Sequence, residues 1–162
     1  MNIPEQQTNL CLLMKEGQVL LAMKKRGFGT GRWNGVGGKL LEGETIESSL
    51  MREMKEEIGV TVHEQDLKKC GLLDFYFQTK PEWSQRVHVF FVTSWEGEPT
   101  ETEEMKPQWF PLSAIPYDEM WVDDRHWLPI VLKGQSVTAS FTFSDLGTTI
   151  AEMSVTPGPA VW

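Results

Sequence analysis

The clearest hydrophobic periodicity in the chain lies in the stretch that follows Thr45. When each residue is placed about 100° on from the last, its apolar side chains fall on one arc of a helix. They are Ile46, Leu50, Met51, Met54 and Ile58. Thr45 is suited to cap the start of this helix, and Gly59 suits the left-handed position just past its end. The pattern therefore predicts an amphipathic helix between these two residues.

Three glutamates border the apolar arc of this helix instead of lying opposite it. Glu53, Glu56 and Glu57 have i, i+3, i+4 spacing, which makes them neighbours on the helix surface, and Glu57 projects between Ile46 and Leu50. Clustered carboxylates repel one another and are costly to desolvate without a cation. Oxygen-only ligands favour magnesium or manganese. The cluster indicates a metal site, while the helix alone fits an ordinary acidic shoulder equally well.

Apolar runs elsewhere predict strands joined by turns. The expected strands cover residues 8–14, 18–24, 68–78, 86–95 and 105–112, and residues 139–155 resemble a closing hairpin. Residues 156–162 are expected to form a loose tail. No internal repeat or linker divides the chain, so its 162 residues suit one domain spanning residues 1–162.

The stretch before the helix, residues 24–39, is rich in glycine and positive charge. Six glycines and five basic residues share its sixteen positions. Glycines let a backbone approach a ligand closely, and basic side chains offset phosphate charge. A flexible surface loop is the alternative, but the neighbouring carboxylates favour phosphate binding. Gly37 and Gly38 also leave carbonyl oxygens accessible to a hard cation.

A second candidate site combines aromatic and acidic residues. Asp123 and Asp124 are adjacent and lie between Trp121 and Trp127. The aspartates could cap the helix that follows, which is expected to end near Leu132. The alternative is a pocket for a purine base, because aromatic planes stack on a base. Two close carboxyls also disfavour double ionisation, so one can stay protonated and donate a hydrogen bond.

Several single residues stay open between a structural and a functional role. Thr8 fits a surface position or a pocket wall, and Glu104 fits an exposed acid or a metal ligand. Phe75 and Phe77 are more often core residues than ligand contacts. His88, alone in an apolar strand, is expected to be a structural histidine with its hydrogen bonds satisfied.

Composition narrows the class of protein. The net charge of -8 argues against nonspecific binding to nucleic acid or to an anionic membrane. Cys11 and Cys70 have no metal-like spacing, so they are expected to be buried free thiols. No stretch approaches the ~20 apolar residues of a membrane span. We expect a cytoplasmic monomer, with a nuclear or organellar pool left open.

The glutamate helix belongs to a longer motif. Gly38, Glu44 and the run from Arg52 to Val60 fill every fixed position of G-x5-E-x7-R-E-U-x-E-E-x-G-U, where U is a bulky apolar residue. The chain thus resembles the Nudix hydrolases over residues 38–60. Residues 23–29, 31–35, 87–90 and 120–124 further resemble the branch that hydrolyses oxidised purine nucleoside triphosphates, such as 8-oxo-dGTP and 2-oxo-dATP, and is related to bacterial MutT.

This resemblance implies an α/β fold, an α/β/α sandwich around a mixed sheet. It also implies an enzyme in which water attacks the nucleotide polyphosphate, giving a nucleoside monophosphate and pyrophosphate. The implied magnesium ligands, with manganese as a substitute, are the Gly37 carbonyl and the carboxylates of Glu53, Glu56, Glu57 and Glu104. Glu57 or Glu53 would act as base, and Arg52 would orient the glutamates.

The resemblance also implies a substrate site in which Asn34, Trp121 and the aspartate pair read the base. The full set is Thr8, Lys24, Asn34, Val36, Gly37, Gly38, Lys39, Phe75, Phe77, Trp121, Val122, Asp123, Asp124 and Trp127. Gln85 and Val122 depart from the methionine and proline expected at these positions. A preference for another modified purine, such as a methylated one, therefore stays open. A noncatalytic nucleotide-binding module is a further alternative, although such modules typically lose signature glutamates.

Overall fold

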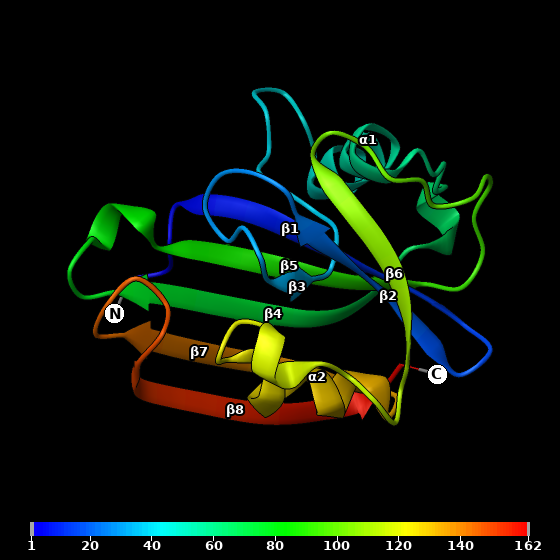
Figure 1. Cartoon of the computed structure of the whole chain (residues 1–162). Helices are drawn as coiled ribbons and strands as arrows, with labels where there is room; N and C mark the ends of the chain where they lie inside the picture. The colour runs from blue at the N-terminus through cyan, green and yellow to red at the C-terminus, as the bar shows by residue number, and fades with distance from the viewer. Residues whose placement is uncertain (1, 162) are drawn as a thin grey trace.

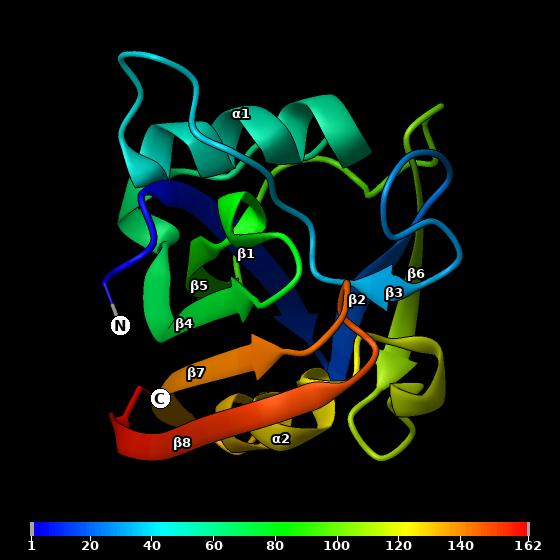
Figure 2. The ribbon, with the colours of Figure 1, turned by 90° about the vertical axis from the view of Figure 1, so that its left-hand side faces the viewer.

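A mixed β-sheet runs through the centre of the computed structural model, which describes residues 2–161. Helix α1 (Ile46–Ile58) covers one face of this sheet and helix α2 (Asp124–Leu132) covers the other (Figures 1 and 2). Short 3-10 helices occupy Glu64–Asp66, Pro81–Trp83 and Tyr117–Glu119. No helix in the described range is long and apolar enough to cross a bilayer. The predicted α/β fold with a mixed sheet is confirmed.

Eight strands of the described range build the sheet. They are β1 (Gln6–Lys15), β2 (Gln18–Lys24), β3 (Trp33–Asn34), β4 (Lys68–Phe77), β5 (Gln85–Val92), β6 (Met105–Pro111), β7 (Gln135–Phe143) and β8 (Ile150–Ala160). Their order is β3-β2-β1-β5-β4-β7-β8, with β6 paired to β2. The β1–β5 and β4–β7 pairs are parallel, and the other pairs are antiparallel. Long connections therefore bring distant segments side by side.

Helix α1 forms as its sequence predicts. The side chain of Thr45 accepts a hydrogen bond from the Ser48 N–H at 3.0 Å, and Gly59 ends the helix at φ 74°. Leu50, Met54 and Ile58 are fully buried against the sheet. At about 25 cal/mol per Å² of apolar surface, this buried stripe is the main source of the helix's stability.

Helix α2 packs through its aromatic and aliphatic side on the opposite face of the sheet. Trp127, Leu128 and Val131 are buried there, in contact with a cluster that includes Leu73 and Phe141. The helix ends at Leu132, as expected. Because the two helices cover different faces, side chains that alternate along one strand enter two separate cores.

Strand β8 corrects one prediction. Residues 156–160, expected to be part of a loose tail, pair with β7, and the Val161 N–H donates to the Gly134 carbonyl at 2.8 Å. Trp162, the last residue of that expected tail, lies outside the described residues. The two prolines of this segment hide its strand character in the sequence, yet proline is tolerated on an edge strand, where its missing N–H faces away from the ladder.

The minor structural predictions hold. Cys11 and Cys70 are buried free thiols, and burial raises the pKa of Cys70 to about 12. His88 is hydrogen-bonded on both ring nitrogens, to Lys69 at 2.8 Å and to Gln7 at 2.7 Å. Burial and the nearby Lys69 lower the pKa of His88 to about 4. It is therefore a neutral structural histidine at physiological pH.

Candidate active site

A cavity of about 310 Å³ lies between the sheet, the glycine-rich segment and the start of α2. It contains most of the side chains predicted to bind substrate, together with one of the three signature glutamates. They are Thr8, Lys24, Asn34, Gly37, Gly38, Lys39, Glu57, Phe75, Phe77, Trp121, Asp123, Asp124 and Trp127. Thr8 is only 5% exposed and faces this cavity, so the surface alternative for it is wrong.

Two predicted substrate residues lie elsewhere. Val36 is buried with Leu50 and Met54 in the core under α1, because its backbone pairs with Cys11 of β1 and turns its side chain to that face. Val122 lines a separate surface hollow next to Tyr117. Neither residue lines the cavity, so their predicted contact with substrate stays a prediction.

Two further residues complete the aromatic wall of the cavity and were not predicted. The Phe28 ring lies 5.1 Å from that of Trp121, and the Arg32 guanidinium lies 4.1 Å over the same indole. Both come from the loop after β2, so only folding brings them onto Trp121. In the sequence, both residues could have been found only as members of the basic, glycine-rich segment.

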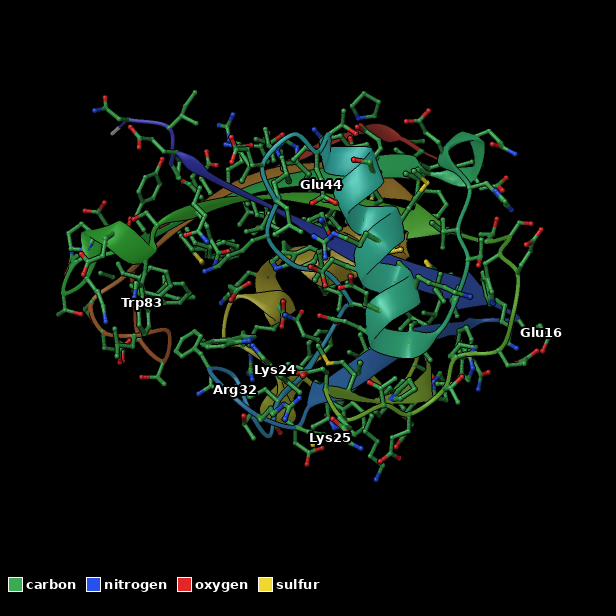
Figure 3. The ribbon with its side chains drawn as sticks, turned by 90° about the horizontal axis from the view of Figure 1, so that it is seen from above. Glu16, Lys24, Lys25, Arg32, Glu44 and Trp83 are labelled. Carbon is green, nitrogen blue, oxygen red and sulfur yellow. The ribbon has the colours of Figure 1, made fainter. Side chains whose placement is uncertain are left out.

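The basic residues of this segment lie together. Lys24, Lys25 and Arg32 are grouped away from Glu44, which lies just before the start of α1 (Figure 3).

The aspartate pair closes one end of the cavity. Asp123 and Asp124 are 4% and 3% exposed, and the Asp123 Oδ2 accepts a hydrogen bond from the Trp127 Nε1–H at 2.9 Å. Asp123 occupies the N-cap position of α2, but its side chain caps no helical N–H. The helix-cap interpretation is therefore wrong, and the side chains are held toward the cavity instead.

Burial makes these two acids hard to ionise. It raises the pKa of Asp123 to about 6, while the hydrogen bond from Trp127 works in the opposite direction. For Asp124, burial and the adjacent Asp123 raise the pKa well above its usual range. Oδ2 of Asp124 is buried without a hydrogen-bond partner among the described residues. The pair can thus offer a ligand one donor and one acceptor.

Glu57 stands at the other end of the cavity, where α1 meets the glycine-rich segment. Its Oε2 atom is buried without a hydrogen-bond partner among residues 2–161. Burial, followed by the neighbouring Glu53, raises the pKa of Glu57 to about 8, and Lys24 opposes this rise. A carboxylate oxygen left without a partner in such a place marks a position that a cation or a proton would stabilise.

Arg52 organises the other signature acids. Its guanidinium donates to Glu44 at 2.7 and 3.0 Å, to Glu53 at 3.1 Å and to Glu56 at 3.1 Å. The same side chain donates to the Lys39 carbonyl at 3.2 Å. One arginine therefore ties the loop to three carboxylates on or next to the helix, which is the orienting role expected of it.

Asn9 of β1 links the glycine-rich segment to the helix. Its Nδ2 donates to Ser49 Oγ at 2.7 Å, and its Oδ1 accepts from the Gly38 N–H at 3.3 Å. A Cβ atom on Gly37 would collide with the Asn9 backbone. The glycines are needed because strand, loop and helix meet without room for side chains.

Comparison with known proteins identifies the family to which this site belongs. A family model described as the NUDIX domain matches residues 5–130. The chain belongs to the Nudix family. Among its relatives is an oxidized purine nucleoside triphosphate hydrolase from Mus musculus, 46% identical over 142 residues, which are 88% of this chain and 89% of that protein. A protein of the same name from Danio rerio is 47% identical over 134 residues, 83% of this chain and 84% of its own.

The fold agrees with that of solved Nudix relatives. The crystal structure of a MutT protein from Bacillus halodurans matches with a TM-score of 0.78 at 24% identity, over 95% of this chain and 99% of that one. At this identity the match bears on the fold alone.

Nudix enzymes generally use a divalent metal such as Mg²⁺. Here the predicted ligands are all oxygen donors, and the partnerless oxygen of Glu57 fits a hard cation. Within residues 2–161, no three acidic, histidine or cysteine side chains converge closely enough to enclose a metal by themselves. Glu56 is held by Arg52, and Glu104 accepts hydrogen bonds from Arg26. The donor chemistry thus fits magnesium, and Glu104, which is paired with Arg26, lies close enough to Glu57 to help raise the pKa of Glu57.

Proposed function

We propose that this Nudix protein hydrolyses oxidised purine nucleoside triphosphates, such as 8-oxo-dGTP, to the monophosphate and pyrophosphate. One observation carries the proposal: a single cavity joins a buried aspartate pair at one end to Glu57 and the glycine-rich segment at the other. The two relatives named oxidized purine nucleoside triphosphate hydrolases, 46% and 47% identical over most of the chain, support it.

The base would bind at the aspartate end. Trp121 offers an aromatic face, and Asp123 and Asp124 offer an acceptor and a donor to the Watson–Crick edge. Oxidation changes which positions of a purine carry hydrogens. A site whose two acids can share protons in more than one way can match more than one oxidised base.

The phosphates would lie at the Glu57 end. Lys24 and Lys39 line this part of the cavity and offset phosphate charge, while Gly37 and Gly38 let the backbone come close. Magnesium, held by the Gly37 carbonyl and by Glu53, Glu56, Glu57 and Glu104, would supply charge neutralisation and a more acidic bound water.

The chain's own groups perform the remaining tasks. Glu57, which lines the cavity, or Glu53, whose carboxylate packs against Gly38, would accept the proton of the attacking water. Arg52 keeps Glu53 and Glu56 in place through its ion pairs. Phe75, Phe77 and Trp127 shape an apolar wall that excludes bulk water from the base.

A substrate panel tests the function. Turnover of normal, oxidised and methylated purine triphosphates, scored for pyrophosphate and monophosphate, should favour the oxidised ones in kcat/KM. Preference for a methylated purine would change the assigned substrate to methylated purines, and binding without turnover would show a noncatalytic module.

The variant Glu57→Gln tests the catalytic role. Its turnover should fall by roughly 100-fold or more at saturating magnesium, if Glu57 serves both metal binding and proton transfer. A monomer in the cytoplasm remains the prediction from the sequence.

A further inference from the structure

Gln85 places a free amide in the aromatic wall of the cavity. It is the first residue of β5, where it pairs with Phe75 of β4 and with Gln6 of β1. Its side chain lines the cavity on the same strand face as Val87. Within residues 2–161, the structure gives the Gln85 amide no side-chain hydrogen bond, and its partner on β4, Phe75, is apolar.

Gln85 is half-buried, so a ligand that covers its amide must replace the hydrogen bonds that the amide makes with solvent. A primary amide presents a carbonyl acceptor and an N–H donor side by side. Removing these groups from water without partners costs on the order of the hydrogen bonds they forgo. The ligand complementary to it carries a neighbouring N–H and C=O, which is a lactam.

An oxidised purine offers this lactam on its five-membered ring. In an 8-oxopurine, N7 carries a hydrogen and C8 carries a carbonyl oxygen, so the pair can meet the amide with two hydrogen bonds. In an unoxidised purine, N7 is an acceptor and C8 carries a hydrogen, so only the amide N–H finds a partner. A 2-oxopurine keeps this unoxidised imidazole edge, because its extra oxygen is on the six-membered ring.

The sheet topology separates Gln85 from Asn34, one of the groups that would read the base. Asn34 belongs to β3, which is separated from β5 by β2 and β1 in the sheet. The aspartate pair enters from the start of α2, on the face of the sheet that α2 covers. A base held with its six-membered ring toward Asp123 and Asp124 and its imidazole edge toward the β4–β5 wall would meet Gln85.

We propose that Gln85 is a specificity-determining residue that recognises the N7–H and C8=O pair of 8-oxopurine nucleotides. The inference rests on the proposed function and adds to it a residue that recognises the oxidised position of the base. Gln85 then selects 8-oxopurines over both normal purines and purines oxidised at C2.

The test compares kcat/KM for 8-oxo-dGTP, dGTP and 2-oxo-dATP in the wild type and in Gln85→Met, which keeps the side-chain length but removes the amide. The matched control is Gln6→Met, the same change on the neighbouring strand and outside the cavity. Gln85→Met should lower the 8-oxo-dGTP to dGTP ratio by about fivefold, because 8-oxo-dGTP loses one more hydrogen bond of ordinary net strength than dGTP does. The 2-oxo-dATP to dGTP ratio in Gln85→Met should change less than twofold, because both nucleotides lose the same single hydrogen bond, and no ratio should change more than twofold in Gln6→Met.

Equal losses for 8-oxo-dGTP and 2-oxo-dATP would overturn the inference, since Gln85 would then only shape the wall. So would an unchanged ratio. A wild type that shows no preference for any oxidised purine would instead refute the proposed function. A binding measurement on the wild type alone guards against a misfolded variant: 8-oxo-dGMP should bind at least about fivefold tighter than 8-bromo-dGMP, which lacks the N7–H. Equal affinity of the two monophosphates would also overturn the inference.

Discussion

A Cβ atom on Gly38 would lie 2.5 Å from Oε1 of Glu53. This contact explains why the first position of the Nudix motif is a glycine in a segment that needs no left-handed backbone there. The loop and the helix approach so closely that a single methyl group would displace a carboxylate assigned to the metal. Arg52, which donates to the same Glu53 oxygen at 3.1 Å, keeps that carboxylate against the loop.

Gly38→Ala should therefore damage catalysis more than folding. Because a displacement near 1 Å at a reacting group can cost roughly 100-fold in rate, we expect a loss of that size in kcat. Gly43→Ala is the control: Gly43 has φ 85° and nothing within 4 Å, so its substitution strains the backbone without moving Glu53. The control should lower Tm by a few degrees and keep most of the turnover. Full activity in Gly38→Ala would contradict the close-packing explanation.

Arg52→Lys should keep the positive charge but lose the fixed orientation of the glutamates that Arg52 holds. A lysine cannot donate to Glu44, Glu53 and Glu56 at once from a planar fork. Since groups that orient metal ligands typically contribute 10- to 100-fold, kcat should fall by roughly that factor. Steady-state kinetics and the magnesium concentration for half-maximal activity measure the effect. The control variant is Arg125→Lys. The exposed ion pair between Arg125 and Asp118 lies outside the cavity, so this variant should leave kcat unchanged.

The aspartate pair should make stability depend on pH. Burial raises the pKa of Asp123 from 3.8 to about 6, so the folded state binds a proton more tightly than the unfolded chain. The stabilising contribution is therefore fully present below pH 3.8 and is lost as pH rises to about 6. Relative to Asp123→Asn, the wild type should lose a few degrees of Tm over this window.

Thermal unfolding of both proteins from pH 4 to pH 7 measures that difference. The same variant has a second readout, because Asp123→Asn should reduce the preference for oxidised bases more than it reduces magnesium binding. A constant Tm difference across the window would mean that the pair does not hold an extra proton. A larger effect on magnesium than on base preference would remove the aspartate from the base-reading role.

Trp121 should lose its position when the β7–β8 loop changes. A Cβ atom on Gly147, at φ 119°, would lie 2.5 Å from Cζ3 of the indole. Asp145 holds this loop in place by accepting the N–H groups of Gly147, Thr148 and Thr149 at 2.9–3.0 Å. Gly147→Ala should raise KM by about three- to tenfold, the value of one aromatic stacking contact, and leave kcat nearly unchanged.

Gly17→Ala is the matched control for the Trp121 prediction. Gly17 also has a positive φ, 73°, but nothing lies within 4 Å of its Cβ position. It should therefore share the backbone strain and the loss in Tm, but not the rise in KM. If both variants raised KM equally, the contact with Trp121 would not position the base.

Local patterns in the sequence determined α1, its caps and the family. Helical periodicity, Thr45 and Gly59 act over a few residues, so they could be read without knowing the rest of the fold. The glutamates and Arg52 share this helix, and their mutual contacts follow from its 3.6-residue turn. The strands were also predicted where apolar runs were long, because burial on a sheet face needs such runs.

Only the tertiary structure decided how distant segments meet. Strand pairing directs the Val36 side chain into the core beneath α1. Packing of α2 buries Asp123 and Asp124, which by sequence alone could have been helix caps. Glu104 faces Arg26 because β2 and β6 run side by side, a long-range contact that no local pattern encodes. Residues 156–160 gain their strand from β7 alone, since two prolines give them little strand propensity of their own. The sequence thus determined the chemistry carried by one helix, whereas long-range pairing decided which side chains surround the base.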